Sequence, residues 1–161
     1  MKQIETDICI IGGGSGGLSL AAGAVQMGAR VVLFEGGQMG GDCLNSGCVP
    51  SKALLAAAKA AYLANGNAAM GITNTPPNID FAAVKAHIAG VIAQIEPHDS
   101  IARFEALGVT VIPEMAHFTG PRAVESAAHQ VRAKYIVIAS GSQPMLPSIP
   151  GLDHTDFFSN A

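Results

Sequence analysis

The sequence predicts an α/β domain built on a parallel sheet, with helices and a small antiparallel meander. Of the 161 residues, 49% are hydrophobic and only 13% are charged, a composition typical of a packed core and not of a disordered chain. Short β-branched runs also alternate with longer helical patterns, as they do around parallel sheets. These runs lie at residues 6–11, 29–34, 109–112 and 134–139.

Charge and hydropathy exclude two classes of partner. The net charge of -3 offers no basic surface to nucleic acid. Residues 8–25 are uncharged, but the glycines between positions 12 and 17 make a poor lipid-facing helix, and no basic leader with a cleavage site precedes them. We therefore expect a soluble, cytoplasmic protein that binds neither nucleic acid nor membrane.

A glycine-rich turn follows the first expected strand, Thr6 to Ile11. Residues 12–17 read Gly-Gly-Gly-Ser-Gly-Gly and match G-x-G-x-x-G through Gly12, Gly14 and Gly17. This pattern suits a tight turn, a backbone bare enough for a pyrophosphate, and a closely packed helix whose first amides hold phosphate. Glycine turns also form for purely conformational reasons, so the match gains weight only from its surroundings.

The surroundings fit a dinucleotide site. An apolar helix is expected over residues 18–27, closed by Gly28, and a second strand over 29–34 ends at Glu35. The acid follows the glycines by about twenty residues, where a dinucleotide fold places the carboxylate that binds ribose hydroxyls. A carboxylate there disfavours a 2′-phosphate, which predicts a nucleotide of the FAD or NAD type.

Two of the three cysteines lie in the segment from Gly40 to Lys52, which reads Gly-Gly-Asp-Cys-Leu-Asn-Ser-Gly-Cys-Val-Pro-Ser-Lys. Four residues separate Cys43 from Cys48, and a helix-forming run that Pro50 can open follows the second thiol. The thiols are expected within reach of each other at a helix N-terminus. Such a terminus, with Lys52, lowers a thiol pKa and favours redox chemistry.

Three other roles for the pair are weighed against redox chemistry. A structural disulfide fits poorly with an odd cysteine count and no secretory signal. A zinc site lacks the Cys-x-x-Cys knuckle and paired histidines. Inert buried thiols fit poorly with the polar residues around the pair, whereas Cys9, inside the first strand, is expected to be a small core residue.

The middle of the chain is expected to be helical. Turn-forming residues over 65–78 end the cysteine helix, and Asp80 is a candidate N-cap for a helix over 81–96 whose apolar stripe should pack on a sheet. Pro97 interrupts this helix, and a further one over 99–107 ends at Gly108. After the strand at 109–112, an antiparallel meander is expected at 115–118, 123–126 and 130–132, followed by a buried strand at 134–139.

Taken in series, these features resemble the N-terminal part of the class I pyridine nucleotide-disulfide oxidoreductases, which include dihydrolipoamide dehydrogenase, glutathione reductase and mercuric reductase. The family's redox pattern, G-G-x-C-x-N-x-G-C-x-P-S-K, matches Gly40 to Lys52 at every fixed position. Its second flavin-side pattern, A-T-G-S-x-P, resembles residues 139–144, where Ser140 replaces the usual threonine and keeps the hydroxyl. The resemblance covers essentially the whole chain.

The resemblance implies a Rossmann-like FAD-binding domain. Cys48 would face the flavin, Cys43 would exchange with a disulfide substrate, and Lys52 would tune the flavin N5 region. NAD(P)H would be the co-substrate of a homodimeric full-length enzyme that acts on a dihydrolipoamide-like thiol or disulfide, or on mercuric ion. No metal site is expected. The residues expected at the cofactor are Gly12, Gly14, Ser15, Gly16, Gly17, Glu35, Gly41, Asp42, Cys43, Cys48, Lys52, Ala116, Ala139, Ser140 and Gly141.

By the same resemblance, residues 1–161 form only the N-terminal part of an FAD-binding domain, and the NAD(P)H-binding and dimerisation domains are absent from this chain. We expect the chain alone to be inactive because it has no second glycine fingerprint and no histidine in a catalytic motif. Two other functions stay open. One is a flavin- or dinucleotide-binding module without disulfide chemistry, and the other is a thiol metal-binding domain.

Overall fold

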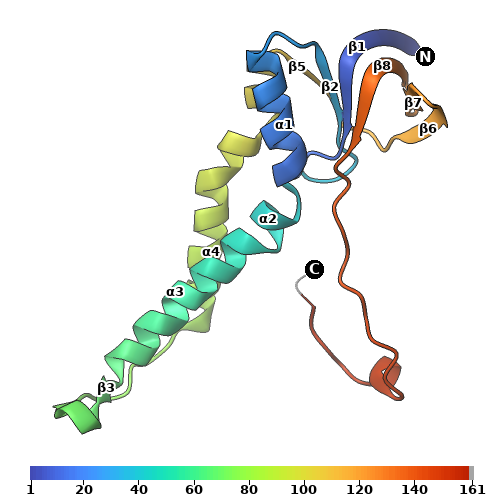
Figure 1. Ribbon diagram of the computed structural model, residues 1–161. Helices are drawn as coiled ribbons and strands as arrows, with labels where there is room; N and C mark the ends of the chain where they lie inside the picture. The colour runs from blue at the N-terminus through green and yellow to red at the C-terminus, as the bar shows by residue number, and fades with distance from the viewer. Residues whose placement is uncertain (160–161) are drawn as a thin grey trace.

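The computed structural model describes residues 1–159 and confirms the α/β class. Its main sheet has six strands in the order β5-β2-β1-β8-β7-β6, and a separate two-stranded ribbon pairs β3 with β4. Figure 1 shows the sheet at one end of the molecule and two long helices projecting from it. The elements are β1 (Lys2–Ile11), α1 (Ser15–Gln26), β2 (Val31–Phe34), α2 (Gly41–Asn45), α3 (Cys48–Ala64), β3 (Gly66–Asn67), η1 (Ala68–Met70), β4 (Ile72–Thr73), α4 (Phe81–Ile95), η2 (Glu96–Asp99), α5 (Ile101–Ala106), β5 (Val109–Ile112), β6 (His117–Gly120), β7 (Ala123–Glu125), β8 (His129–Ile138) and η3 (Leu152–His154).

The central strand of the sheet is β1. It pairs in parallel with β2 on one side and with β8 on the other, and β5 continues the parallel part beyond β2. The antiparallel strands β7 and β6 extend the sheet beyond β8. Asp7 of β1 links the three central strands through ion pairs. Its carboxylate contacts Arg30, the residue before β2, at 3.2 Å and Lys134 of β8 at 2.8 Å. Hydrogen bonds with these two cations hold the pKa of Asp7 well below its usual range.

Two apolar clusters cover the two faces of the sheet. On one face, side chains of α1 and α5 such as Leu18 and Phe104 pack against Ile10 and Leu33. On the other face the curled meander supplies the cover, and Val124 and Val131 pack with strand residues. The strand residues of this second cluster include Cys9, Val32, Phe34 and Ile112.

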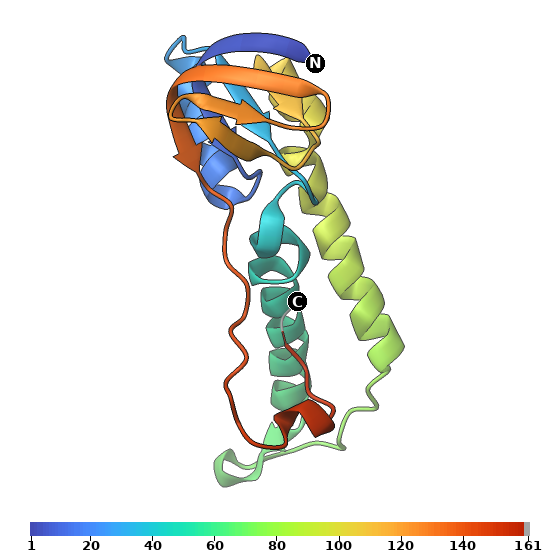
Figure 2. The same cartoon turned by 90° about the vertical axis from the view of Figure 1, so that its right-hand side faces the viewer.

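The helices α3 and α4 pack against each other and extend away from the sheet, and both views show them side by side (Figures 1 and 2). None of the residues of α4 is buried, and Phe81 at its start is exposed. The expectation that the apolar stripe of residues 81–96 packs on a sheet is therefore wrong. The spacing of the apolar residues predicts an apolar face on this helix but not the element that covers it. Another helix, here α3, can cover such a face as well as a sheet can.

The last strand differs from the prediction in two ways. Residues 130–132 and 134–139 were expected to form separate strands, but a single strand, β8, runs through both. The ladder continues because Ala133 is buried and its N–H donates to the carbonyl of Arg122 at 3.0 Å. The expected burial of the second half is also wrong, since Tyr135 and Ile138 are 70% and 68% exposed.

The helix ends follow the expected local signals only in part, and α1 begins at Ser15, before its expected start at residue 18. Asp80 caps α4 as predicted, because its Oδ1 accepts hydrogen bonds from the N–H groups of Ala82 and Ala83 at 2.9 and 3.1 Å. The cysteine helix starts earlier than expected, at Cys48, which places Pro50 inside its first turn. The short helix α2 was not predicted.

Residues 139–159 leave the sheet as a largely exposed segment that runs toward the far end of the helix pair α3 and α4 (Figure 2). The only regular element in the described part of this segment is the turn η3. Within residues 1–159, no helix combines the length and the apolar character needed to cross a membrane.

The close packing of α1 on the glycine turn predicts a stability effect. A Cβ atom on Gly17 would lie 1.9 Å from the carbonyl oxygen of Gly12, whereas a Cβ on Gly23 in the same helix meets no atom within 4 Å. We expect Gly17→Ala to lower the free energy of unfolding by about 1–3 kcal/mol through overpacking. The matched variant Gly23→Ala should raise it by about 0.5–1 kcal/mol because alanine favours the helix. Urea unfolding measures both, and equal effects would contradict this account of the turn.

Candidate active site

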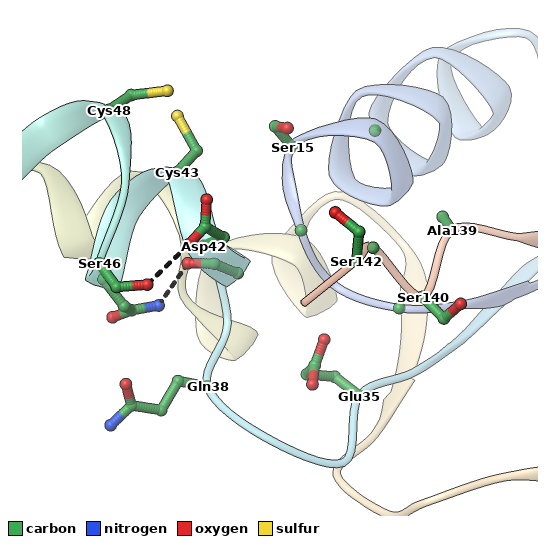
Figure 3. A pocket seen from close by; sticks show the side chains of 16 residues that line it. Ser15, Glu35, Gln38, Asp42, Cys43, Ser46, Cys48, Ala139, Ser140 and Ser142 are labelled. Carbon is green, nitrogen blue, oxygen red and sulfur yellow. Dashed lines mark hydrogen bonds between the residues drawn. The ribbon is translucent and has the colours of Figure 1, made fainter. Parts of the chain in front are cut away.

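Three loops from adjacent strands build a pocket that contains most of the expected site residues of the described chain. They follow β1, β2 and β8, and they meet because the carboxyl ends of neighbouring parallel strands lie at one edge of the sheet. The pocket has a volume of about 740 Å³, and Figure 3 shows its side chains converging from the three loops. Its lining residues are Gly12, Gly14, Ser15, Gly16, Glu35, Gln38, Gly41, Asp42, Cys43, Asn45, Ser46, Cys48, Ala139, Ser140, Gly141 and Ser142.

The first loop is the glycine turn, where the backbone approaches its neighbours too closely for side chains. Gly12 has φ +114°, and a Cβ on it would lie 2.2 Å from the carbonyl oxygen of Ala139. Gly14 is the N-cap residue of α1, and its carbonyl accepts the N–H of Leu18 at 2.9 Å. The amides of residues 15–17 precede that first internal hydrogen bond, so the start of α1 is suited to an anion such as phosphate.

Glu35 stands at the end of β2, as predicted, and lines the pocket. One carboxylate oxygen accepts the N–H of Gly13 at 2.5 Å, and the other accepts the N–H of Gly37 at 2.6 Å. The side chain therefore fixes the glycine turn against the loop that follows β2. The carboxylate also faces the pocket, where ribose hydroxyls can donate to it.

The two pocket cysteines lie on different helices. Cys43 belongs to α2 and Cys48 is the first residue of α3, and Figure 3 shows their sulfur atoms pointing toward each other. Both are free thiols in this structure. Asn45 holds the segment in place, since its side-chain amide donates to the carbonyls of Met39 at 3.1 Å and Gly41 at 2.8 Å.

The protonation of Cys43 is governed by its neighbours in the pocket. A hydrogen bond with the Cys48 thiol, together with burial and the charge of Cys48, raises the pKa of Cys43, and Lys52 offsets only part of this rise. The lowering expected from the sequence was tied to the N-terminus of the helix that follows the cysteines, whereas Cys43 lies in the short helix α2, next to a second thiol.

Cys9 behaves as the predicted core residue. It is fully buried in β1, and burial raises the pKa of its thiol to about 12. A thiol with so high a pKa is a poor nucleophile near neutral pH. The chemistry of the chain's cysteines is therefore confined to Cys43 and Cys48.

The structure brings most of the expected cofactor residues together, with three exceptions that do not line the pocket. Gly17 is buried beneath the turn, Lys52 is exposed on α3, and Ala116 packs against the apolar cluster on the meander side of the sheet. Sequence reasoning also missed four lining residues. Asn45 and Ser142 stand at fixed positions of the two family patterns, which could have identified them; Gln38 and Ser46 carry no such signal.

A metal centre finds no support in the part of the chain that the structure describes. No three or more His, Cys, Asp or Glu side chains gather there in a geometry that could hold a metal ion. Cys43 and Cys48 thus have no third metal-binding side chain of this kind beside them within residues 1–159.

Comparisons with known proteins agree with this geometry. Residues 6–161 match the family described as pyridine nucleotide-disulphide oxidoreductase. The chain is 33% identical over 156 residues to a mercuric reductase of Bacillus cereus, which covers 97% of this chain and 25% of that protein. It is 37% identical over 169 residues to a dihydrolipoyl dehydrogenase of Pseudomonas aeruginosa, which covers 93% of this chain and 34% of that protein.

A solved structure gives the same result for the fold. The HOCl-induced flavoprotein disulfide reductase RclA from Escherichia coli, solved as a Cu(II) complex, superposes with a TM-score of 0.73 at 25% identity. The superposition covers 92% of this chain and 31% of that structure. The chain thus spans about a quarter to a third of the proteins it resembles. The fold, the pocket and the family match together establish that the chain belongs to the pyridine nucleotide-disulphide oxidoreductase family.

Proposed function

We propose that the chain is the N-terminal part of the FAD-binding domain of a flavin-dependent disulfide oxidoreductase, in which Cys43 and Cys48 form the redox-active disulfide. The observation that carries this proposal is the position of both thiols in the same pocket as the glycine turn and Glu35. A binding module without disulfide chemistry would not need two facing thiols beside its dinucleotide turn.

The residues of the pocket fit FAD. Glycines 12, 14 and 41 leave the backbone bare on the pocket side, and side chains at Gly12 and Gly41 would meet backbone atoms at 2.2 and 2.8 Å. The first amides of α1 would hold the pyrophosphate, and Glu35 would accept hydrogen bonds from the ribose hydroxyls. FAD, when bound, supplies the capacity to accept a hydride and pass on its electrons as a pair.

The two cysteines would act in different roles. Net, NAD(P)H and one proton reduce the Cys43–Cys48 disulfide to two thiols and leave NAD(P)⁺. Cys48, at the start of α3, would be the thiol on the flavin side, and Cys43 would attack the substrate disulfide. Because the pKa of Cys43 is raised, that attack needs a base to remove its proton. No histidine lines the pocket among residues 1–159, and the family resemblance points to a His-Glu pair of a partner subunit.

The names of the relatives suggest the substrate classes. A mercuric reductase and a dihydrolipoyl dehydrogenase match this chain at similar identity, so mercuric ion and a dihydrolipoyl-type dithiol are the two substrates we propose to test. The same resemblance supports a cytoplasmic, homodimeric enzyme that uses NAD(P)H. Tuning of the flavin by Lys52 also belongs to this proposal.

The proposed function predicts that NAD(P)H opens the cysteine pair. In the full-length, FAD-loaded protein, anaerobic NAD(P)H should convert Cys43 and Cys48 from a linked pair to two alkylatable thiols, while buried Cys9 stays unmodified. Mass spectrometry of alkylated peptides before and after reduction measures this change. Retained flavin with thiols that do not respond would favour a binding module without disulfide chemistry, and stoichiometric zinc without flavin would favour a metal-binding domain.

The ribose contact predicts a loss of cofactor affinity. We expect Glu35→Ala to weaken FAD binding by about 1–3 kcal/mol, the range for losing hydrogen bonds to a charged group. Part of the loss would come from the glycine turn, because Glu35 also accepts the N–H of Gly13. Flavin content after extended dialysis, with a titration of the apoprotein, measures the effect. Full retention of FAD by the variant would count against the nucleotide assignment.

The raised pKa of Cys43 predicts opposite effects of two substitutions. Cys48→Ala removes the hydrogen bond and charge that raise this pKa, so alkylation of Cys43 should begin at lower pH. Lys52→Gln removes a positive charge that lowers the pKa, so alkylation should begin at higher pH. Rates of iodoacetamide labelling across a pH series, resolved by mass spectrometry, give both midpoints. Midpoints that shift in the same direction would refute this account of the pair.

A further inference from the structure

The segment that carries the cysteines leaves four positions free in the family pattern, namely 42, 44, 46 and 49. Two of the residues at these positions contact each other. The hydroxyl of Ser46 donates to Oδ1 of Asp42 at 2.7 Å, and Figure 3 draws this hydrogen bond in the segment that carries Cys43 and Cys48. The contact spans the end of α2, from its second residue to the residue that follows it.

The main chain joins the same residues a second time. The carbonyl oxygen of Asp42 accepts the N–H of Ser46 at 3.0 Å and the N–H of Gly47 at 2.6 Å. A Cβ on Gly47 would lie 2.5 Å from Oδ2 of Asp42 and 3.0 Å from its carbonyl oxygen. Asp42 therefore lies directly against the two-residue connection between α2 and α3.

The contact between Asp42 and Gly47 is one residue away from each thiol. Cys43 follows Asp42, and Cys48 follows Gly47. A change in the distance between Asp42 and Gly47 consequently alters the distance between the two sulfur atoms. In a dithiol that must form and break its disulfide in each catalytic cycle, the distance between the sulfur atoms determines how readily the disulfide forms.

We propose that Asp42 and Ser46 are a positioning pair that holds Cys43 and Cys48 ready for disulfide closure and so sets the reduction potential of the couple. This inference rests on the proposed disulfide function. The reaction is balanced with glutathione disulfide as oxidant: one thiolate attacks it and releases glutathione, and the second thiolate displaces the other glutathione. Two thiols lose two electrons and two protons, and two glutathione molecules form.

A carboxylate beside two thiols can also act through its charge, since a negative charge disfavours thiolates. The two effects separate experimentally. Asp42→Asn removes the charge but keeps a side-chain oxygen that accepts the Ser46 hydroxyl, whereas Asp42→Ala removes both. Ser46→Thr likewise keeps the hydroxyl that Ser46→Ala removes.

The test is the equilibrium of the full-length holoenzyme with glutathione buffers of graded ratio, quenched with acid and quantified as linked and alkylated peptides. We expect Asp42→Ala and Ser46→Ala each to lower the equilibrium constant for disulfide closure by only about two- to fivefold, since the hydrogen bond is exposed to solvent. That change raises the reduction potential by about 10 to 20 mV. The double variant should show no larger shift than either single variant, because both remove one shared interaction.

Asp42→Asn and Ser46→Thr are the matched controls and should keep the wild-type equilibrium. Flavin absorbance and the melting temperature show that each variant is folded. Additive effects of the two alanine substitutions, or a shift in Asp42→Asn as large as in Asp42→Ala, would overturn the positioning role. A wild-type protein that forms no link between Cys43 and Cys48 at any glutathione ratio would instead overturn the proposed function itself.

Discussion

The pairing of β1 with its two parallel neighbours fixes the position of every loop in the pocket. In the register of the sheet, Ile11 lies opposite Phe34 of β2 and opposite Ile138 of β8, so the three strands end level. The ladder runs one residue further on both sides, because the N–H of Gly12 donates to Phe34 and the N–H of Ala139 donates to Ile11, each at 2.8 Å. The residues that begin the three loops therefore start side by side, which is the condition for a shared pocket.

The same pairing explains why the chain's thiols differ in reactivity. The strands β1 and β8 stay paired along their full length, well beyond the short strand β2, and the meander that follows curls over one face. Val124 and Val131 close that face over Cys9, which is why this thiol is buried and keeps its proton. Cys43 and Cys48 lie outside both apolar clusters, in loops and helix ends that line the pocket.

The sequence predicted those features whose cause is local. The glycine turn, the position of Glu35 and the cap at Asp80 each depend on a few neighbouring residues, and the structure confirms all three. The partner of α4 and the continuity of β8 depend on contacts between distant segments, and these predictions failed. An apolar stripe or a β-branched run in the sequence indicates that a segment needs a packing partner. It does not identify the element that provides the packing.

The site was predictable to the extent that its residues stand at fixed positions of a pattern. Asn45 was missed although it is one of those positions, because its role is to bind the carbonyls of Met39 and Gly41 and not the cofactor. Ala116 was expected at the cofactor but packs on the meander side of the sheet in the described chain. Residues that support a site and residues that contact a ligand thus give the same signal in a sequence pattern, and only the packing distinguishes them.

Two consecutive glycines, Gly40 and Gly41, show why the glycine turn after β1 and the cysteine segment form one structural unit. The N–H of Gly40 donates to the carbonyl of Gly13 at 2.9 Å, and Gly14 and Gly40 form a parallel bridge. Gly41 has φ +58°, and a Cβ on it would lie 2.8 Å from the Cα of Gly14. Gly41 is therefore required by the approach of two backbones and not by thiol chemistry, whereas a Cβ on Gly40, which has φ +86°, would lie 2.5 Å from the side chain of Leu44. A side chain at position 41 would push the cysteine segment away from the glycine turn, so the turn and the two thiols beside it are held in place by the same contact.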